Sequence, residues 1–136
     1  MFIPALFCMV LFFSGFVYWQ KVIGSESSNP VWNQEHVQFQ TIENKLLDVG
    51  FSVNQLIFIG NPPGYFVTTG RTAFAIPDGD MNTLKEVAQK YNVQILAIDE
   101  NHPKGLDSFY QQGISLGGFN YLFNVGKYQI YTFKGN

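Results

Sequence analysis

Five polar residues are the candidates for chemistry in this chain, because each follows an apolar run of strand length. They are Asn61, Asp78, Asp80, Asp99 and His102. If the three runs form parallel strands, their carboxyl ends meet at one edge of a sheet, which is where open α/β sheets bind ligands. Carboxylates and an imidazole gathered at such an edge could hold a divalent cation or polarise a sugar or phosphate.

The sequence favours a structural interpretation of the same residues. Asp78 and Asp80 are residue types that a turn and a helix N-cap require. Asp99 and His102 belong to a polar loop that ends at Pro103. The sequence therefore predicts either a ligand site at this edge or a set of caps and loops, and it identifies no catalytic residue.

Arg71 is the sixth candidate ligand-binding residue. It follows Gly70 and enters a predicted strand, a position from which a guanidinium can clamp a carboxylate or a phosphate with two hydrogen bonds. The alternative is an internal ion pair, for which the sequence offers three carboxylates: Asp48, Asp78 and Asp99.

Several kinds of site are excluded by residue type. The turn 60–64 contains two prolines and no following Lys-Ser/Thr, so it cannot cradle a phosphate as a P-loop does. Cys8 is the only cysteine and lies in the apolar N-terminal segment, so the rest of the chain offers no thiolate ligand or nucleophile. No metal site and no cofactor is predicted.

Apolar periodicity predicts the elements that position these residues. Helical spacing extends over residues 34–49, Asp80 is a suitable N-cap for a helix ending at Tyr91, and residues 124–127 form a hairpin turn near the end. The three apolar runs lack clean alternation, as in strands covered on both faces; they are residues 55–59, 72–76 and 93–98. We expect a three-layer α/β domain with three parallel strands and a C-terminal antiparallel hairpin.

The first 19 residues carry no charged side chain, and they end in Tyr18 and Trp19 before Lys21. A helix of this length would reach about 28 Å, close to the ~30 Å core of a bilayer. A transmembrane helix is therefore expected over residues 1–23, a linker over 24–33 and an α/β domain over 34–136. A cleaved signal peptide and a buried helix are the alternatives.

Charge limits the partners. The net charge is −2, and the basic residues are scattered rather than gathered in a patch, which argues against nucleic-acid binding. Lys21 is the only basic residue among the first 44, so the segment after the predicted span lacks the positive charge of a cytoplasmic flank. We expect a cell-membrane location, with the domain on the extracytoplasmic side and the lipid bilayer as a partner.

The order of several motifs resembles a known family. The motifs are Ile57-Phe58-Ile59-Gly60-Asn61-Pro62-Pro63-Gly64, Thr69-Gly70-Arg71, Ala75-Ile76-Pro77-Asp78-Gly79-Asp80 and Ile95-Leu96-Ala97-Ile98-Asp99. Residues 35–133 resemble the C-terminal extracytoplasmic domain, preceded by the last membrane span, of bacterial membrane glycosyltransferases related to protein O-mannosyltransferases and aminoarabinose transferases. That family's catalytic acidic residues lie in loops near the beginning of the protein, and none matches a position here.

The resemblance implies an accessory domain that is not catalytic on its own. It would belong to, or derive from, a glycosyltransferase that uses a polyprenyl-phosphate sugar, and other transmembrane segments of that enzyme would be its partners. The alternative is a free-standing single-pass protein whose α/β domain binds a ligand or a partner.

Overall fold

The computed structural model describes residues 3–20, 33–113 and 115–134. The chain divides into two units, residues 1–37 and 38–136. The first unit contains helix α1 (Ile3–Tyr18), whose side chains from Phe7 onward are exposed. The predicted linker 24–33 lies outside the described residues except for residue 33.

The prediction of a transmembrane helix over residues 1–23 is wrong. Helix α1 has 16 residues, which gives a length of about 24 Å against the ~30 Å of a hydrocarbon core. No helix in the described part of the chain has both the length and the apolar character needed to cross a bilayer. The predicted cell-membrane location rested on this span and is corrected with it.

The second unit alternates helices with strands. Its elements, in chain order, are α2 (Gln34–Asp48), β1 (Leu56–Ile59), α3 (Pro62–Thr69), β2 (Ala73–Ala75), α4 (Met81–Tyr91), β3 (Val93–Ile98), the 3₁₀ turn Lys104–Leu106, α5 (Asp107–Gln112), β4 (Phe119–Val125) and β5 (Tyr128–Phe133).

All five strands belong to one sheet of order β2-β1-β3-β5-β4. Strand β1 pairs in parallel with β2 and with β3, while β5 pairs antiparallel with β3 and with β4. The predicted fold class is therefore corrected in a second respect, because the sheet is mixed rather than built of three parallel strands. The hairpin continues the sheet because Ile95–Ile98 of β3 pairs with β5.

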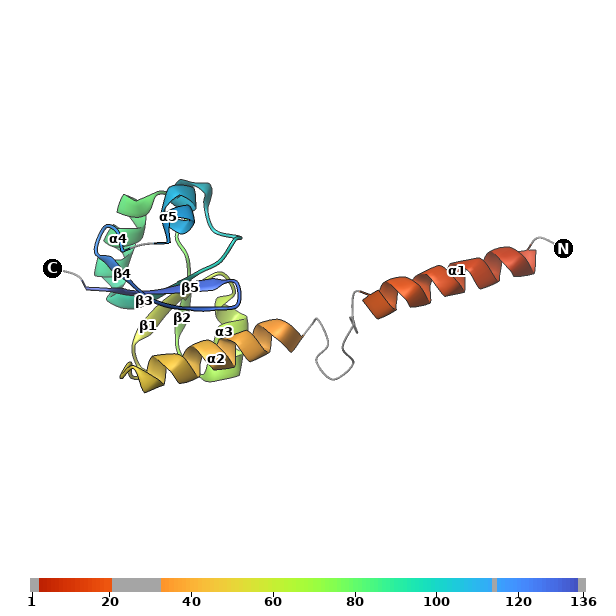
Figure 1. The fold of residues 1–136 in the computed structure, drawn as a ribbon, viewed down its shortest axis with the longest axis horizontal. Helices are drawn as coiled ribbons and strands as arrows, with labels where there is room; N and C mark the ends of the chain where they lie inside the picture. Colours follow the sequence, from red (N-terminus) through yellow and green to blue (C-terminus); the bar gives the residue numbers. More distant parts are fainter. Residues whose placement is uncertain (1–2, 21–32, 114, 135–136) are drawn as a thin grey trace. The chain divides into compact units, whose positions relative to one another are not determined.

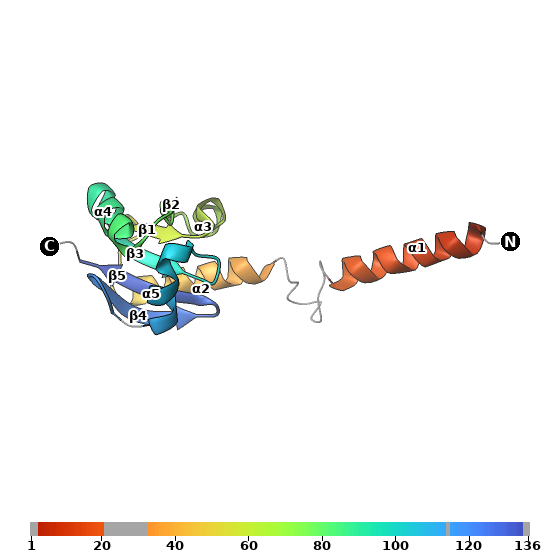
Figure 2. The same ribbon diagram turned by 90° about the horizontal axis from the view of Figure 1, so that it is seen from above.

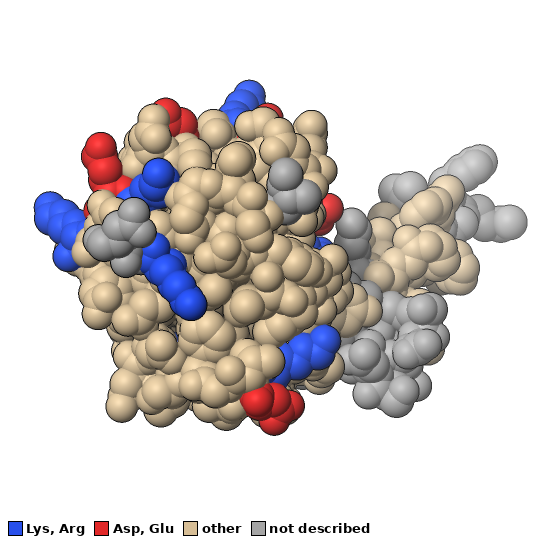
Figure 3. All heavy atoms as spheres, turned by 60° about the vertical axis from the view of Figure 1, so that its left-hand side comes forward, with Lys and Arg blue, Asp and Glu red and all other residues tan. Residues whose placement is uncertain are grey.

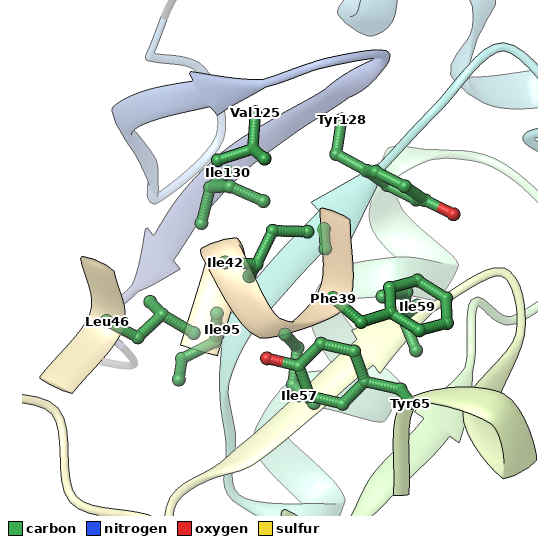
Figure 4. Packing of buried hydrophobic residues seen from close by; sticks show 11 residues of the cluster. Phe39, Ile42, Leu46, Ile57, Ile59, Tyr65, Ile95, Val125, Tyr128 and Ile130 are labelled. Atoms are coloured by element: carbon green, nitrogen blue, oxygen red, sulfur yellow. The ribbon is translucent and has the colours of Figure 1, made fainter. Parts of the chain in front are cut away.

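Helices cover both faces of the sheet. Figure 1 shows α2 and α3 on one side and α4 and α5 on the other. Each side has its own hydrophobic core. Beneath α2, the side chains Phe39, Ile42 and Leu46 point from the helix toward the strands (Figure 4), at the i, i+3, i+7 spacing of one helix face.

The opposite core lies under α4 and α5. Leu84 and Ala88 of α4 and Phe109 of α5 pack there with Leu96 and Tyr131 of the sheet. The Phe109 ring lies 4.7 Å from the Tyr131 ring, measured between centroids. A sheet covered on both faces explains why the strand sequences show apolar runs without alternation.

Candidate functional site

Two of the candidate residues at the strand ends are helix caps. The Asn61 side chain accepts a hydrogen bond from the Gly64 N–H at 3.1 Å and caps α3. The Asp80 carboxylate accepts from the N–H groups of Asn82 and Thr83 at 3.1 and 3.0 Å and caps α4. These bonds lower the pKa of Asp80 below its usual value, led by the bonds from Thr83.

Asp99 lies at the end of β3, next to the end of β1. Its Oδ2 contacts the Lys127 ammonium at 2.9 Å, and its Oδ1 accepts from the Asn101 N–H at 3.2 Å. A Cβ added to Gly60 would lie 3.7 Å from Asp99 Oδ1, so the carboxylate fills the space beside the end of β1. The ion pair therefore occupies the place where a ligand would enter between these strands.

His102 joins the same edge through Asp99. Its Nδ1 lies 2.6 Å from the Asp99 carbonyl oxygen, and its Nε2 lies 3.1 Å from Asp107 Oδ1. The imidazole also stacks on Tyr110 at 4.5 Å between ring centroids. These contacts connect the loop after β3 to helix α5 and leave the ring mostly buried.

The loop after β3 closes over the loop after β2. A Cβ added to Gly105 would collide with the backbone of Gly79 and Asp80, so these two loops pack backbone against backbone. Asp78 is exposed beside this contact. The structure thus brings Asp99 and His102 together and brings loop 78–80 against loop 103–106. Asn61, Asp80, Asp99 and His102 all contact other groups of the protein.

Arg71 takes no part in this edge of the sheet. It is fully buried under α2. Its Nε and Nη2 donate to the two oxygens of Glu43, both at 2.8 Å. Its Nη1 donates to the carbonyl oxygens of Ser52 and Gln55 at 2.6 and 2.8 Å. The Tyr65 hydroxyl donates to Glu43 Oε2 at 2.9 Å. We call Arg71, Glu43 and Tyr65 the buried triad.

The buried triad has no room for a ligand. The guanidinium and the carboxylate each direct their polar atoms at protein groups, which is what stabilises a buried charge pair. Burial raises the pKa of the Tyr65 phenol, and the charge of Glu43 raises it further. The triad links α2, α3, the loop 52–55 and the segment that leads into β2, so its chemistry is structural.

Sequence reasoning missed two partners in these networks. The three carboxylates expected to pair with Arg71 do not, and Glu43 does. Glu43 occupies the same helix face as Phe39, Ile42 and Leu46, so the periodicity could have placed it in the core. Lys127 lies in the hairpin turn, 28 positions after Asp99, and no local pattern indicated that contact.

The described residues contain no group of three or more His, Cys, Asp or Glu side chains that could hold a metal ion. No protein-family model matches the chain, and no match was found among curated proteins or solved structures. We therefore describe the molecule as an α/β domain and no longer as a glycosyltransferase-like membrane protein. No family match supports the glycosyltransferase description, and no described helix is able to span a membrane. The resemblance itself stays a prediction.

Proposed function

We propose that the α/β domain is a non-catalytic accessory domain that binds an extended, apolar segment of a partner polypeptide along the free side of β2. The observation that carries this proposal is the character of β2 as a sheet edge. Strand β2 is the first strand of the sheet, and Figure 2, seen from above, shows it between α3 and α4.

Strand β2 pairs with β1 alone among the described strands. The segment Thr72-Ala73-Phe74-Ala75-Ile76 contains no charge and no proline. Natural proteins protect exposed edges with lysine, proline, bulges or a covering element, because an unpaired strand is a template for another chain. An edge with no charge and no proline favours the addition of a strand.

The pairing of β1 with β2 indicates which backbone groups face outward. The Ile57 N–H donates to the Thr72 carbonyl at 3.4 Å. In a parallel ladder, alternate residues point their N–H and C=O groups at one neighbour. Phe74 therefore points these groups at β1, and Ala73 and Ala75 direct theirs away from the sheet. An extended backbone laid beside β2 can accept hydrogen bonds from both of these outward N–H groups.

Apolar side chains flank this edge and define the chemistry of the segment. The Phe74 and Tyr91 rings lie 6.2 Å apart between centroids, and they are 39% and 52% exposed. Helix α3 contacts β2 and exposes Phe66 and Val67. An added strand would therefore meet apolar surface, so we expect apolar side chains on the segment itself.

The second edge of the sheet is built differently. Strand β4 has an irregularity in its pairing between Tyr121 and Phe123, and the Tyr121 N–H donates to Ser115 Oγ at 2.9 Å. Leu116 forms a further bridge with Phe119. These features occupy or distort the β4 edge, so β2 is the better acceptor for a strand.

The non-catalytic part of the proposal rests on the candidate polar residues. Arg71, Asp80 and Asp99 all make contacts with protein groups that explain their presence. A catalytic group needs access to a substrate, and the buried triad has none. The family resemblance, which implies an accessory domain, agrees with this conclusion and is independent of the edge.

The test selects random heptapeptides by phage display on the full chain and then measures hydrogen exchange with a synthesised peptide. We expect extended apolar peptides that slow exchange of the Ala73 and Ala75 amides. The variant Ala75→Pro removes one outward N–H without touching the pairing with β1, and we expect affinity to fall about tenfold. The matched control Ala75→Ser keeps that N–H and should bind as the wild type does.

Two results would overturn the proposal. One is equal binding by Ala75→Pro and Ala75→Ser, with both variants folded by circular dichroism. The other is protection of Ala73 and Ala75 that grows with protein concentration without peptide, because that would assign the edge to a second copy of this chain.

A further inference from the structure

A small hollow lies on the other side of the sheet from the buried triad. It has a volume of about 180 Å³ and lies between α4, the glycines before β4 and the end of β5; its lining is Lys85, Gln89, Gly117, Gly118, Phe133 and Lys134. Drug-sized ligands use pockets of about 300–1,000 Å³. The hollow therefore suits a small ligand, or one charged group of a larger molecule.

The lining carries two positive charges and no negative one. Lys85 comes from α4 and Lys134 from the residue after β5, so the fold brings together lysines that are far apart in sequence. Within the described part of the chain, neither ammonium has a hydrogen-bond or ion-pair partner. Figure 3 shows several Lys and Arg side chains on the left of this face, with Asp and Glu side chains beside some of them.

The two glycines shape the walls. Gly117 has φ +63°, and a Cβ there would lie 3.3 Å from Met81 Cγ and 3.6 Å from Lys85 Cδ. A Cβ on Gly118, at φ +91°, would lie 3.2 Å from the Phe133 ring. Their lack of side chains lets the loop lie close to α4 and leaves backbone near the hollow. The Lys85 stem packs beside Gly117 and so brings its ammonium to the hollow.

Two unpaired ammonium groups around one hollow create a positive local potential that favours an anion over a neutral ligand. Gln89 adds an amide that can donate hydrogen bonds. Lysine binds phosphate oxygens as a point charge, and a tetrahedral oxyanion can accept from both lysines and the amide together. We propose that this hollow binds a phosphate group, supplied by a small molecule. The site is independent of the β2 edge.

The test is a titration of the full chain with inorganic phosphate, followed by ¹⁵N–¹H correlation spectra at constant ionic strength set with NaCl. We expect saturable shifts at the Gly117, Gly118 and Gln89 amides. The double variant Lys85→Gln/Lys134→Gln should weaken binding at least about tenfold, since it removes two charge-assisted contacts. It should not change the resonances of the opposite core.

Lys90→Gln is the matched control. It removes one charge from the same helix, but Lys90 lies over the Tyr91 ring, 5.4 Å from its centroid, and does not line the hollow. Phosphate affinity should therefore change less than about twofold. If Lys90→Gln lost as much phosphate affinity as the double variant, or if the chemical shifts did not saturate, the binding would reflect the overall charge of the protein. Either result would overturn the proposal.

A second arm distinguishes the source of the phosphate. The full chain is mixed with phosphatidylcholine vesicles that either contain or lack phosphatidic acid, and sedimentation is measured for the wild type and the double variant. Saturable binding of inorganic phosphate without a vesicle effect supports a small-molecule ligand. Binding to phosphatidic acid alone, lost in the double variant, would overturn that source and assign the group to a lipid.

Discussion

The two faces of the sheet are stabilised by different means. The face under α2 and α3 contains a fully buried arginine, its carboxylate partner and a tyrosine hydroxyl, while the face under α4 and α5 is filled by aliphatic and aromatic side chains. Buried charges carry a desolvation penalty that only complete hydrogen bonding offsets, whereas apolar side chains need only volume and shape. The first face therefore depends on specific partners, and the second on packing.

This difference has a consequence for the assembly of the fold. Arg71 donates to four acceptors on two other segments of the chain: the two carboxylate oxygens of Glu43 in α2, and the carbonyl oxygens of Ser52 and Gln55 in the following loop. Hydrogen bonds have preferred directions and apolar contacts do not, so apolar contacts could not specify the four directions in which Arg71 donates. The buried triad thus fixes the position of β2 beside β1, and with it the edge that we propose as a binding site.

The largest expected effect is the loss of Arg71. Arg71→Met leaves Glu43 buried without its cation, and removal of one partner from a buried pair costs about 3–5 kcal/mol. Urea unfolding followed by circular dichroism measures this loss. The double variant Glu43→Met/Arg71→Met should be less destabilised than Arg71→Met alone. Equal destabilisation of the two variants would mean that the ion pair, rather than the isolated charge, dominates.

A cavity on the apolar face should have a smaller and independent effect. Leu84 of α4 is fully buried, and Leu→Ala changes at such sites cost about 2–5 kcal/mol. Since the sheet separates Leu84 from Arg71, their effects should add within about 0.5 kcal/mol. Non-additive unfolding energies in the combined variant would show that the faces are coupled.

The sequence predicted helices α2 and α4, the strands β1 to β3 and the terminal hairpin from periodicity and turn residues, because those signals are local. The sequence-based prediction was wrong about the length of the N-terminal helix and about how the strands pair. The apolar segment near the N-terminus forms a helix of only 16 residues, and the hairpin joins β3 through contacts that no local pattern encodes.

The candidate site divides in the same way. Asp80 is a helix cap, which the sequence offered as the structural alternative to a ligand site, and Asn61 is a cap that the sequence reasoning did not predict. The sequence offered three aspartates as partners of Arg71, whereas the partner is Glu43, which lies on the apolar face of its helix. The hollow lined by Lys85 and Lys134 could not be predicted, because these residues are far apart in the sequence and come together only in the folded domain.

Two of the buried tyrosines, one on each face, allow a finer comparison of the faces. Tyr65 donates to a carboxylate and Tyr131 to the amide oxygen of Gln129, at 2.9 and 2.7 Å. Hydrogen bonds to charged groups contribute about 1.5–3 kcal/mol and neutral ones about 0.5–1.5 kcal/mol. Tyr65→Phe should therefore lower the free energy of unfolding more than Tyr131→Phe does. The reverse order would contradict the contrast drawn between the faces.

The smallest effect is a dependence on alkaline pH. Burial raises the pKa of the Tyr131 phenol to about 12, with further contributions from Tyr121 and Tyr110. Because the folded pKa is raised, the phenol contributes stability that is fully present below its unfolded pKa of about 10 and is lost as the pH rises toward 12. In that window the folded state binds more protons than the unfolded state, so the free energy of unfolding falls.

Each such phenol adds a slope of at most about 1.4 kcal/mol per pH unit, or roughly 0.4 kcal/mol between pH 10 and 10.5. The pKa of Tyr65 is raised too, so one tyrosine on each face contributes. In urea unfolding at these pH values, the free energy of unfolding should fall less steeply with pH in Tyr131→Phe than in the wild type. Tyr65→Phe should reduce the slope in the same way. An unchanged slope in either variant would mean that its phenol is hydrated in the folded protein, and that this face is less tightly closed than its packing indicates.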